Sequence, residues 1–247
     1  MMCRLSFCLL AAAVASPLST AADTEVPEWA KGVKVDAPLD HPKISDSFVA
    51  SDPTVWKHIV GEERKGFLQL QYDRKTYKSS YTPKHRSPLH IALLKQYPLT
   101  DFVMDVELMS TTERYGHQDL CLFFGFESPE KYYYVHLAPA PDANAHNVFI
   151  VNAAARKNLL EPQEKGVEWK KDHWHTVRVV RQATTGKIEV FFDDLTKPIL
   201  KAEDKTFQTG FVGFGSFDDT GRFRRVTLYT KNLTLDRRAE FFKPIGK

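Results

Sequence analysis

The sequence predicts an all-β protein, built as a two-sheet antiparallel β-sandwich of the jelly-roll type. About a dozen stretches show the alternation of apolar and polar residues that half-buried strands require, and they are short and closely spaced. Gly, Pro and Asp residues, which favour turns, separate these stretches. Only residues 236–242 carry a short helical pattern, so strands joined by turns are the predicted architecture.

The clearest of these stretches is a predicted hairpin over residues 119–137. The turn-forming segment 127–131 separates two β-rich runs, and both faces of each run carry apolar or aromatic side chains. Such a hairpin belongs inside a sandwich rather than at the edge of a sheet. The predicted core face carries Leu120, Leu122, Phe124, Phe126, Tyr133, Val135 and Leu137, and the opposite face carries Asp119, Cys121, Phe123, Gly125, Tyr132, Tyr134 and His136.

Further strands are predicted along the rest of the chain. Residues 55–60 and 66–72 alternate at period two and form a second predicted hairpin. The turn at 184–186 joins two more strands, and the turn at 218–221 joins the last two. The remaining predicted strands are 88–94, 101–109, 147–152, 174–181, 187–192, 210–217 and 223–230, with Val177, Val179, Val226 and Leu228 buried between the sheets.

The chain begins with the pattern of a secretory signal peptide. Arg4 precedes an apolar run at 5–14, and small residues precede Asp23. The run is shorter than the roughly 20 residues that a membrane span requires, and no later segment could cross a membrane. We therefore expect a secreted or periplasmic protein without membrane insertion. The predicted organisation is a signal peptide at 1–22, an extended lead-in at 23–44, the β-sandwich domain at 45–230 and a C-terminal tail at 231–247.

Composition limits the partners of the domain. A hydrophobic content of 43% over 247 residues suits one globular domain with a sizeable core. The net charge is only +3 and the basic residues are scattered among acidic ones, which argues against binding to nucleic acid. Cys3 and Cys8 would leave with the signal peptide, so Cys121 is expected to be a buried structural thiol with no disulfide partner.

Three segments resemble the concanavalin A-like lectin/glucanase superfamily. They are the strand 174–179 that begins with Trp174, the hairpin 186–194 that ends in two Asp residues, and the closing hairpin 210–229. More narrowly, the chain resembles secreted bacterial domains grouped with the 3-keto-disaccharide hydrolase family, over residues 99–229. The resemblance implies a concanavalin A-like jelly roll and an activity on glycosides that proceeds through a keto-sugar.

The chain departs from the laminarinase-type enzymes of that superfamily. Their catalytic motif, Glu-x-Asp-x-x-Glu on one strand, is absent here. Asp105 and Glu107 share one strand face, but no third carboxylate follows. The retaining glucanase mechanism therefore cannot be transferred. Whether the protein is an enzyme stays open at this point, with a glycoside hydrolase or a lyase-like activity as the two possibilities.

The predicted hairpin carries the candidate catalytic residues, which are His117, Asp119 and His136. His117 and Asp119 lie two residues apart at the entry of the first strand, and His136 lies on the next strand. Strands about 4.8 Å apart bring same-face side chains into contact. Tyr132 and Tyr134 are in phase with His136, so they are candidate substrate-binding residues. The set could transfer protons next to a carbonyl group, bind a metal ion, or be purely structural.

Three further residues, Asn152, Arg156 and Trp169, are candidates for substrate binding. Arg156 lies after a predicted strand that ends at Asn152, and arginine suits a carboxylate or sulfate on a polysaccharide. Trp169 could stack on a sugar ring. Asp218-Asp219 either forms a β-turn or binds calcium, which is the one cofactor we consider, and the identity of any other metal stays unknown.

Two hypotheses follow for the function. The first is a secreted carbohydrate-active protein that acts on glycosides, with an oligo- or polysaccharide as its partner. The alternative is a non-catalytic carbohydrate-binding module of the lectin/laminin-G type. An enzyme should have titratable groups converging in a pocket, whereas a binding module should have a shallow aromatic face. The sequence does not determine which sugar is bound or the oligomeric state.

Overall fold

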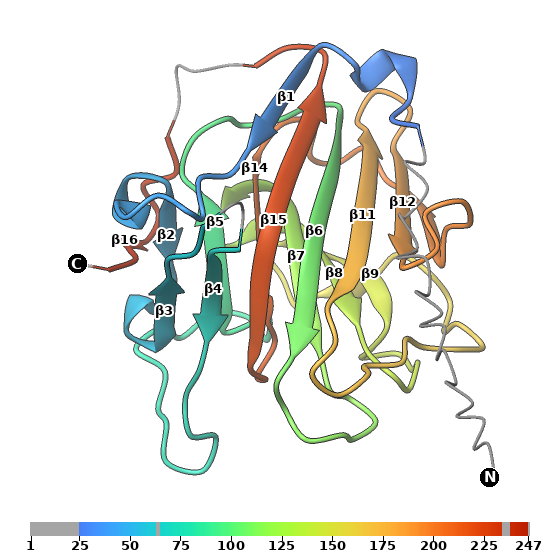
Figure 1. Cartoon of the computed structure of the whole chain (residues 1–247). Helices are drawn as coiled ribbons and strands as arrows, with labels where there is room; N and C mark the ends of the chain where they lie inside the picture. The colour runs from blue at the N-terminus through green and yellow to red at the C-terminus, as the bar shows by residue number, and fades with distance from the viewer. Residues whose placement is uncertain (1–24, 63–64, 234–237, 247) are drawn as a thin grey trace, which may run out of the picture.

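The computed structural model describes residues 25–62, 65–233 and 238–246. Nearly all of its regular structure is β, arranged as two antiparallel sheets packed face to face (Figure 1). The predicted fold class, a two-sheet antiparallel β-sandwich, is therefore confirmed. The predicted signal peptide at 1–22 lies outside the described residues. No helix in the described part of the chain is both long and apolar enough to cross a membrane.

Sheet A is the front layer in Figure 1. β6 and β15 are neighbours in the middle of the sheet. β1 pairs with the C-terminal part of β15, from Thr227 to Thr230. In spatial order the sheet consists of β13 (Leu200–Glu203), β12 (Lys187–Phe192), β11 (His175–Gln182), β6 (Phe102–Ser110), β15 (Gly221–Thr230), β4 (Phe67–Leu70) and β3 (Trp56–Ile59), with β1 (Val33–Asp36) beside β15.

Sheet B is the second layer and carries the predicted hairpin at its middle. In spatial order it consists of β10 (Lys157–Asn158), β9 (Asn147–Asn152), β8 (Lys131–Leu137), β7 (Leu120–Ser128), β14 (Phe211–Ser216), β5 (His90–Leu94), β2 (Phe48–Ala50) and β16 (Lys243–Pro244). Three short 3-10 helices complete the fold, η1 (Glu28–Ala30), η2 (Ile44–Asp46) and η3 (Pro53–Val55).

The main hydrophobic core lies between the two sheets. All four residues that the sequence placed there, Val177, Val179, Val226 and Leu228, are buried in it. Complete burial of one such aliphatic side chain stabilises the fold by about 1.5–3 kcal/mol. The period-two pattern therefore identified the inward faces of β11 and β15 correctly. The predicted hairpin of residues 55–60 and 66–72 is also present, as β3 and β4.

A β-bulge in β7 changes one predicted face. The pairing of β7 with β8 shifts register after Phe124, and Gly125 adopts a φ of +54° there. An extra residue in one strand reverses the alternation beyond it. Phe126 was predicted to share the core face with Leu120, but it packs on the outer face of sheet B, stacked on Tyr132 with ring centroids 4.7 Å apart.

Replacing Gly125 with alanine is expected to destabilise the protein by about 1–3 kcal/mol, because a positive φ strains a side chain. The new Cβ would also lie 3.0 Å from Cδ2 of Tyr133, which is buried in the core. Urea unfolding measures the change in the free energy of unfolding. Gly116→Ala is the control, expected to change stability by less than about 0.5 kcal/mol, since Gly116 is exposed. Equal stability of the Gly125 variant and the wild type would contradict this role of the bulge.

The sandwich extends beyond the predicted limits of 45–230 at both ends. β1 lies in the segment predicted to be an extended lead-in, and it pairs with β15 over four residues. β16 lies in the predicted C-terminal tail and pairs with β2. The described part of the predicted helical stretch 236–242 contains no helix, and Arg238 forms an isolated bridge with Gln96 instead.

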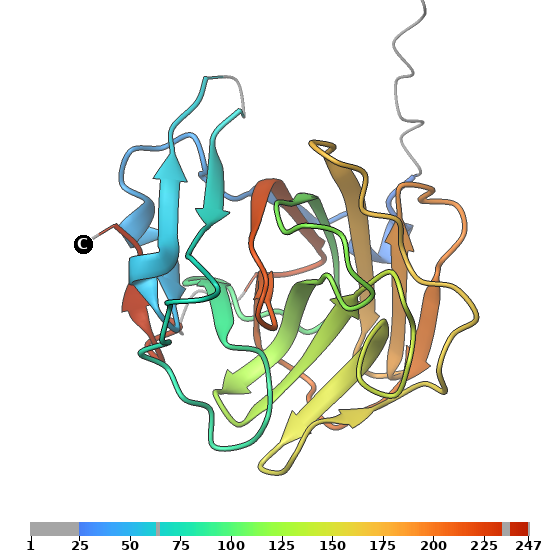
Figure 2. The ribbon, with the colours of Figure 1, turned by 90° about the horizontal axis from the view of Figure 1, so that it is seen from below.

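The outer face of sheet B carries a second apolar cluster rather than an open surface. Val49, Phe123, Tyr132 and Tyr134 are among its buried members. The loop 71–89, between β4 and β5, contributes Tyr81 to this cluster, and the C-terminal segment contributes Ala239, Phe241 and Phe242. Figure 2 shows the loop, in teal, beside this layer. Most of the predicted groove face is therefore covered, and only its end near His136 opens to solvent.

Candidate functional site

A polar cavity of about 150 Å³ opens at this uncovered end of sheet B. Loops from five parts of the chain surround it, and β8 supplies its floor. The cavity has room for about five water molecules at ~30 Å³ each, so it could take no more than about one sugar ring. Its lining residues are Arg74, Arg86, Tyr115, His117, His136, Asn144, Arg156, Phe217 and Asp218.

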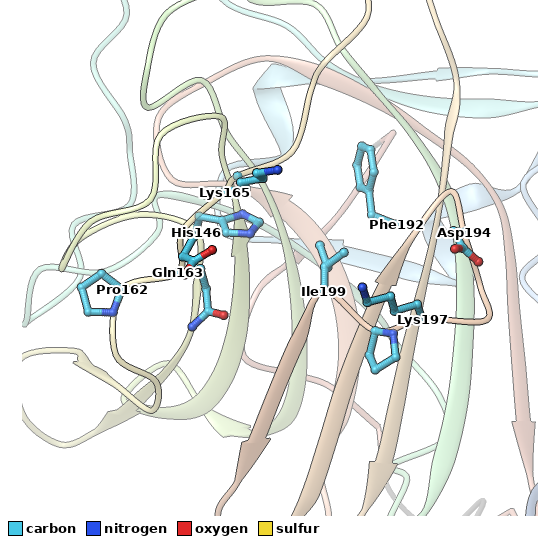
Figure 3. Close-up of a pocket in the computed structure, with 11 residues that line it drawn as sticks. His146, Pro162, Gln163, Lys165, Phe192, Asp194, Lys197 and Ile199 are labelled. Atoms are coloured by element: carbon cyan, nitrogen blue, oxygen red, sulfur yellow. The ribbon is translucent and has the colours of Figure 1, made fainter.

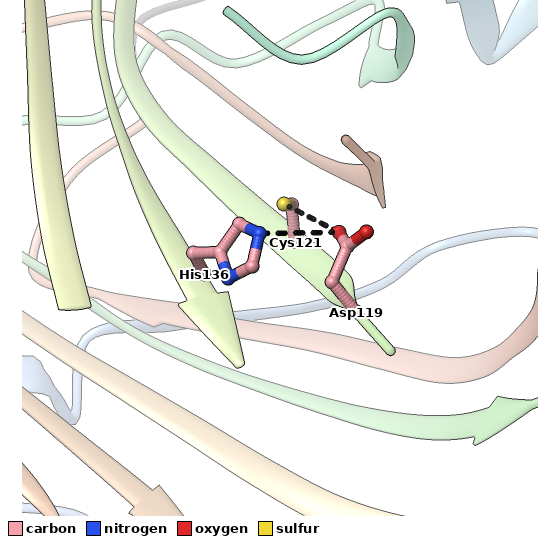
Figure 4. Close-up of side chains that lie close together, drawn as sticks. All are labelled: Asp119, Cys121 and His136. Carbon is pink, nitrogen blue, oxygen red and sulfur yellow. Dashed lines mark hydrogen bonds and ion pairs between the residues drawn. The ribbon is translucent and has the colours of Figure 1, made fainter. Parts of the chain in front are cut away.

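Asp119 lies beneath the cavity and is completely buried. Its carboxylate accepts hydrogen bonds from the Phe217 N–H at 2.7 Å, the Ser216 hydroxyl at 3.1 Å and the Cys121 thiol at 3.2 Å. Its Oδ2 also lies 3.8 Å from Nε2 of His136 (Figure 4). The hairpin pairs Cys121 directly with His136, which explains why Asp119 and His136 meet. Asp119 therefore supports the cavity from below and does not line it.

A second buried carboxylate, Asp219, lies next to Asp119. It accepts hydrogen bonds from the backbone N–H of Asp119 at 2.7 Å and from the Tyr115 hydroxyl at 2.8 Å. Arg74 Nη1 lies 2.7 Å from its other oxygen as an ion pair, without the alignment of a hydrogen bond. Burial, followed by the charge of Asp219, raises the pKa of Asp119, and burial also raises the pKa of Asp219. The pair therefore tends to retain a proton.

His136 is held as a neutral imidazole. Its Nδ1 accepts a hydrogen bond from the backbone N–H of His146 at 3.3 Å, which leaves the ring proton on Nε2. Burial, followed by the charge of Arg156, lowers the pKa of His136 to about 3. Nε2 therefore carries an N–H, which lies 3.8 Å from Oδ2 of Asp119, and His136 is a poor general base in this arrangement.

His117 is hydrogen-bonded to Asp142 at the rim of the cavity. Its Nε2 lies 2.7 Å from Oδ2 of Asp142, and its side chain is 51% exposed. Burial opposes ionisation of Asp142, but the Asn144 N–H and the charge of His117 lower its pKa overall. A carboxylate in this position orients an imidazole and stabilises a positive charge on it. Because Nε2 is engaged by Asp142, Nδ1 is the ring nitrogen left to accept a proton, as a general base must.

Arg156 is fixed between two aromatic rings. Its guanidinium carbon lies 4.7 Å from the ring centroid of Phe149 and 4.6 Å from that of Phe217. Nη1 donates to the Tyr134 hydroxyl at 2.7 Å, and Nη2 donates to the carbonyl of Asn144 at 3.0 Å. Tyr134 is fully buried, so its visible role is to hold Arg156.

Apart from Tyr134, which is buried and holds Arg156, three of the predicted substrate-binding residues do not line this cavity. Tyr132 is buried under the cover of sheet B. Trp169 belongs to the main core, where its indole N–H donates to the carbonyl of Gln118 at 3.0 Å. Asn152 is exposed at the end of β9, outside the lining of the cavity. The structure thus brings His117, Asp119, His136, Tyr134 and Arg156 together, and leaves these three elsewhere.

Two groups of side chains have the spacing of metal ligands, Asp119–Cys121–His136 and Asp119–Asp218–Asp219. The first fits a metal poorly, since burial raises the pKa of both the Cys121 thiol and Asp119, and ligands must be deprotonated. In the second, Arg74 already supplies a positive charge to Asp219. Calcium at Asp218-Asp219 therefore stays an untested possibility with little support from this geometry.

A larger hollow, which we call the edge cavity, lies between the loop 162–166 and the β12–β13 connection (Figure 3). Its volume is about 730 Å³, and it is lined by Phe192, Ile199, Lys165, Asp194 and the buried ring of His146, among others. Its described lining contains no imidazole paired with a carboxylate. For acid–base chemistry the smaller polar cavity is therefore the better candidate.

No protein-family model and no curated protein matches this chain. Among solved structures, the carbohydrate-binding module CBM66 from Bacillus subtilis is similar, with a TM-score of 0.53 and 13% identity over 74% of this chain and 96% of that one. The seed lectin of Lotus tetragonolobus has a TM-score of 0.50 and 12% identity, over 82% and 99% of the two chains. A Bacillus subtilis protein of unknown function with a galectin-like fold has a TM-score of 0.50 and 11% identity, over 81% and 97%.

These similarities support the fold that the resemblance implied, a lectin-like β-sandwich. The narrower resemblance to the 3-keto-disaccharide hydrolase-like domains has no matching family model and stays a prediction. At identities of 11–13% the likeness concerns the fold alone. The chain therefore has the concanavalin A-like β-sandwich fold that lectins and carbohydrate-binding modules share.

Proposed function

We propose that this protein acts on glycosides, binding one sugar ring in the polar cavity and using His117 as the general base. The observation that carries the proposal is the difference between the two imidazoles of the cavity. His117 is paired with the Asp142 carboxylate, whereas His136 is neutral and presents an N–H. One group suited to take a proton and one suited to stabilise negative charge are what proton abstraction next to a carbonyl requires.

The chemistry follows from the resemblance to 3-keto-disaccharide hydrolase-like domains. His117 takes the proton from the carbon between the keto group and the anomeric carbon. The electrons of that C–H bond form a double bond to the anomeric carbon as the glycosidic C–O bond breaks. Protonated His117 then returns the proton to the leaving oxygen, and water adds to the double bond. The N–H of His136 donates to the keto oxygen while negative charge develops on it.

The similar structures support the choice of carbohydrate as the ligand. One is a carbohydrate-binding module and another is a lectin, by their names. The shifted pKa values of His136, Asp119 and Asp142 around one cavity favour an enzyme over a binding module. The 51% exposure of the His117 side chain favours the second candidate function, a non-catalytic carbohydrate-binding module, because such a module binds its ligand on an open face.

We expect the purified protein to cleave 3-keto-disaccharides and to leave the corresponding unoxidised disaccharides intact, because only the keto group acidifies the neighbouring C–H bond. Mass spectrometry of the products, with calorimetric binding of both sugars, checks this expectation. Binding of sugars without any cleavage would support the binding module instead. If neither kind of sugar binds, both candidate functions are wrong.

A further inference from the structure

The polar cavity contains more positive charge than its own carboxylates neutralise. Arg74, Arg86 and Arg156 all line it, and Asp218 is the one carboxylate in the lining. Arg74 is neutralised by Asp219 from below, at 2.7 Å. Arg86 and Arg156 therefore face the space with Asp218 as the remaining negative charge.

Neither of these two guanidiniums has an ion-pair partner within the described ranges. Both lie against the same ring, with Arg156 at 4.6 Å and Arg86 at 5.6 Å from the centroid of Phe217. Two like charges gathered around one aromatic ring repel each other, and an anion between them would remove that cost. The positive charge of Arg156 also acts on His136 at the cavity floor, where it contributes to the lowered pKa of that imidazole.

Arg156 is also oriented before any ligand arrives. Phe149 and Phe217 hold its plane, and its contacts with Tyr134 and Asn144 use Nη1 and Nη2. A guanidinium that is fixed in this way loses little conformational entropy when it binds an oxyanion. Arg86 is exposed and can approach the same ligand from the 71–89 loop.

From this arrangement we propose that the polar cavity selects a sugar that carries an oxyanion, either a uronic carboxylate or a sulfate ester, which Arg156 and Arg86 bind together. The inference rests on the proposed function for the site and specifies its substrate class. Both kinds of oxyanion accept hydrogen bonds from guanidinium groups, so the shared chemistry is the negatively charged oxygen. The volume of about 150 Å³ suits one substituted ring rather than a length of chain.

The test compares three oligosaccharides of one backbone by calorimetry at low salt: a uronate form, its carboxyl-reduced neutral form and a sulfated form. We expect at least one anionic form to bind about tenfold or more tightly than the neutral form. Arg86→Gln and Arg156→Lys should each weaken anionic binding by about tenfold more than they weaken neutral binding. Arg114→Gln is the control, since Arg114 is exposed, does not itself line the cavity although its loop supplies Tyr115 and His117, and its loss changes the net charge equally.

The outcomes separate this inference from the proposed function. If the neutral form binds as tightly as both anionic forms, this inference is wrong and the proposed function stands. If Arg114→Gln weakens anionic binding as much as Arg86→Gln does, general charge rather than the cavity is responsible, and this inference is again wrong. If none of the three sugars binds, the proposed function fails and this inference fails with it. Arg86 is exposed, so its variant is informative even where Arg156→Lys lowers the melting temperature.

Discussion

Replacing His117 with alanine is expected to lower the turnover of a cleaved glycoside by about 10²–10⁴-fold, the usual contribution of a general base. The melting temperature should stay nearly unchanged, because the side chain is 51% exposed and its one side-chain partner in the described part of the protein is Asp142. Exposed substitutions of this kind usually change stability by less than about 0.5 kcal/mol. Steady-state kinetics on a cleaved substrate, together with thermal unfolding, measures both effects.

Two further variants make the expectation specific. Asp142→Asn keeps the shape of the pair but removes the charge that orients His117, so it should lower kcat and shift its pH profile while KM changes little. His41→Ala is the matched control, because His41 is another exposed histidine and lies outside the polar cavity. Unchanged turnover of the His117 variant would exclude His117 as the general base and make His136 the next candidate for this role.

The strands were predictable from the sequence because the core faces alternate at period two. β11 follows this rule along its length, β15 follows it on each side of a bulge between Arg224 and Thr227, and the predicted core residues of both strands are buried. The exception is Phe126, since a bulge depends on how β7 pairs with β14 and β8, which local alternation does not contain. The strands β1 and β16 were missed because four and two residues, partly exposed, are too short for a periodic signal.

The candidate site was predictable only where one hairpin carries it. Asp119 and His136 meet because the register of neighbouring strands brings them together. Asp142, Arg74 and Tyr115 come from loops, where no periodicity exists to place them. Tyr132 and Trp169 are aromatic residues of the kind that stack on sugars. Tyr132 is buried under the cover of sheet B and Trp169 in the main core, and both positions depend on contacts between residues distant in sequence.

Mild acid is expected to unfold the protein, because three histidines are buried in their neutral form. Burial lowers the pKa of His90 to about 4, that of His146 to about 4 and, with Arg156, that of His136 to about 3. The ordinary histidine pKa is 6.5, so between pH 6.5 and about 4 the unfolded chain binds protons that the folded chain does not. Stability that is present above pH 6.5 is therefore lost as the pH falls through this window.

The buried carboxylates act in the opposite direction. Because the pKa of Asp119 is raised, the folded protein keeps a proton above pH 3.8 that the unfolded chain releases, and this contribution to stability falls as the pH rises. The proton that Asp119 retains offsets the proton uptake of one of the three buried histidines on unfolding. About two protons of difference remain, so the free energy of unfolding should fall by about 2.7 kcal/mol per pH unit of acidification. Over roughly two pH units, the loss reaches the lower part of the ~5–15 kcal/mol that stabilises a typical domain.

Urea unfolding at pH 7.0, 6.0, 5.0 and 4.5 measures this slope, and His90→Phe isolates one of its sources. His90 packs against both Tyr72 and Tyr77, at ring-centroid distances of 4.5 Å and 5.5 Å, and neither of its ring nitrogens has a hydrogen-bond partner among the described residues. A phenyl ring keeps these contacts and cannot be protonated, so the variant should lose about 1.4 kcal/mol less per pH unit. It should therefore be more stable than the wild type at pH 4.5, with the polar cavity unchanged. A free energy of unfolding that stays constant from pH 7.0 to 4.5, or an identical slope in the variant, would show that these histidines are protonated in the folded protein.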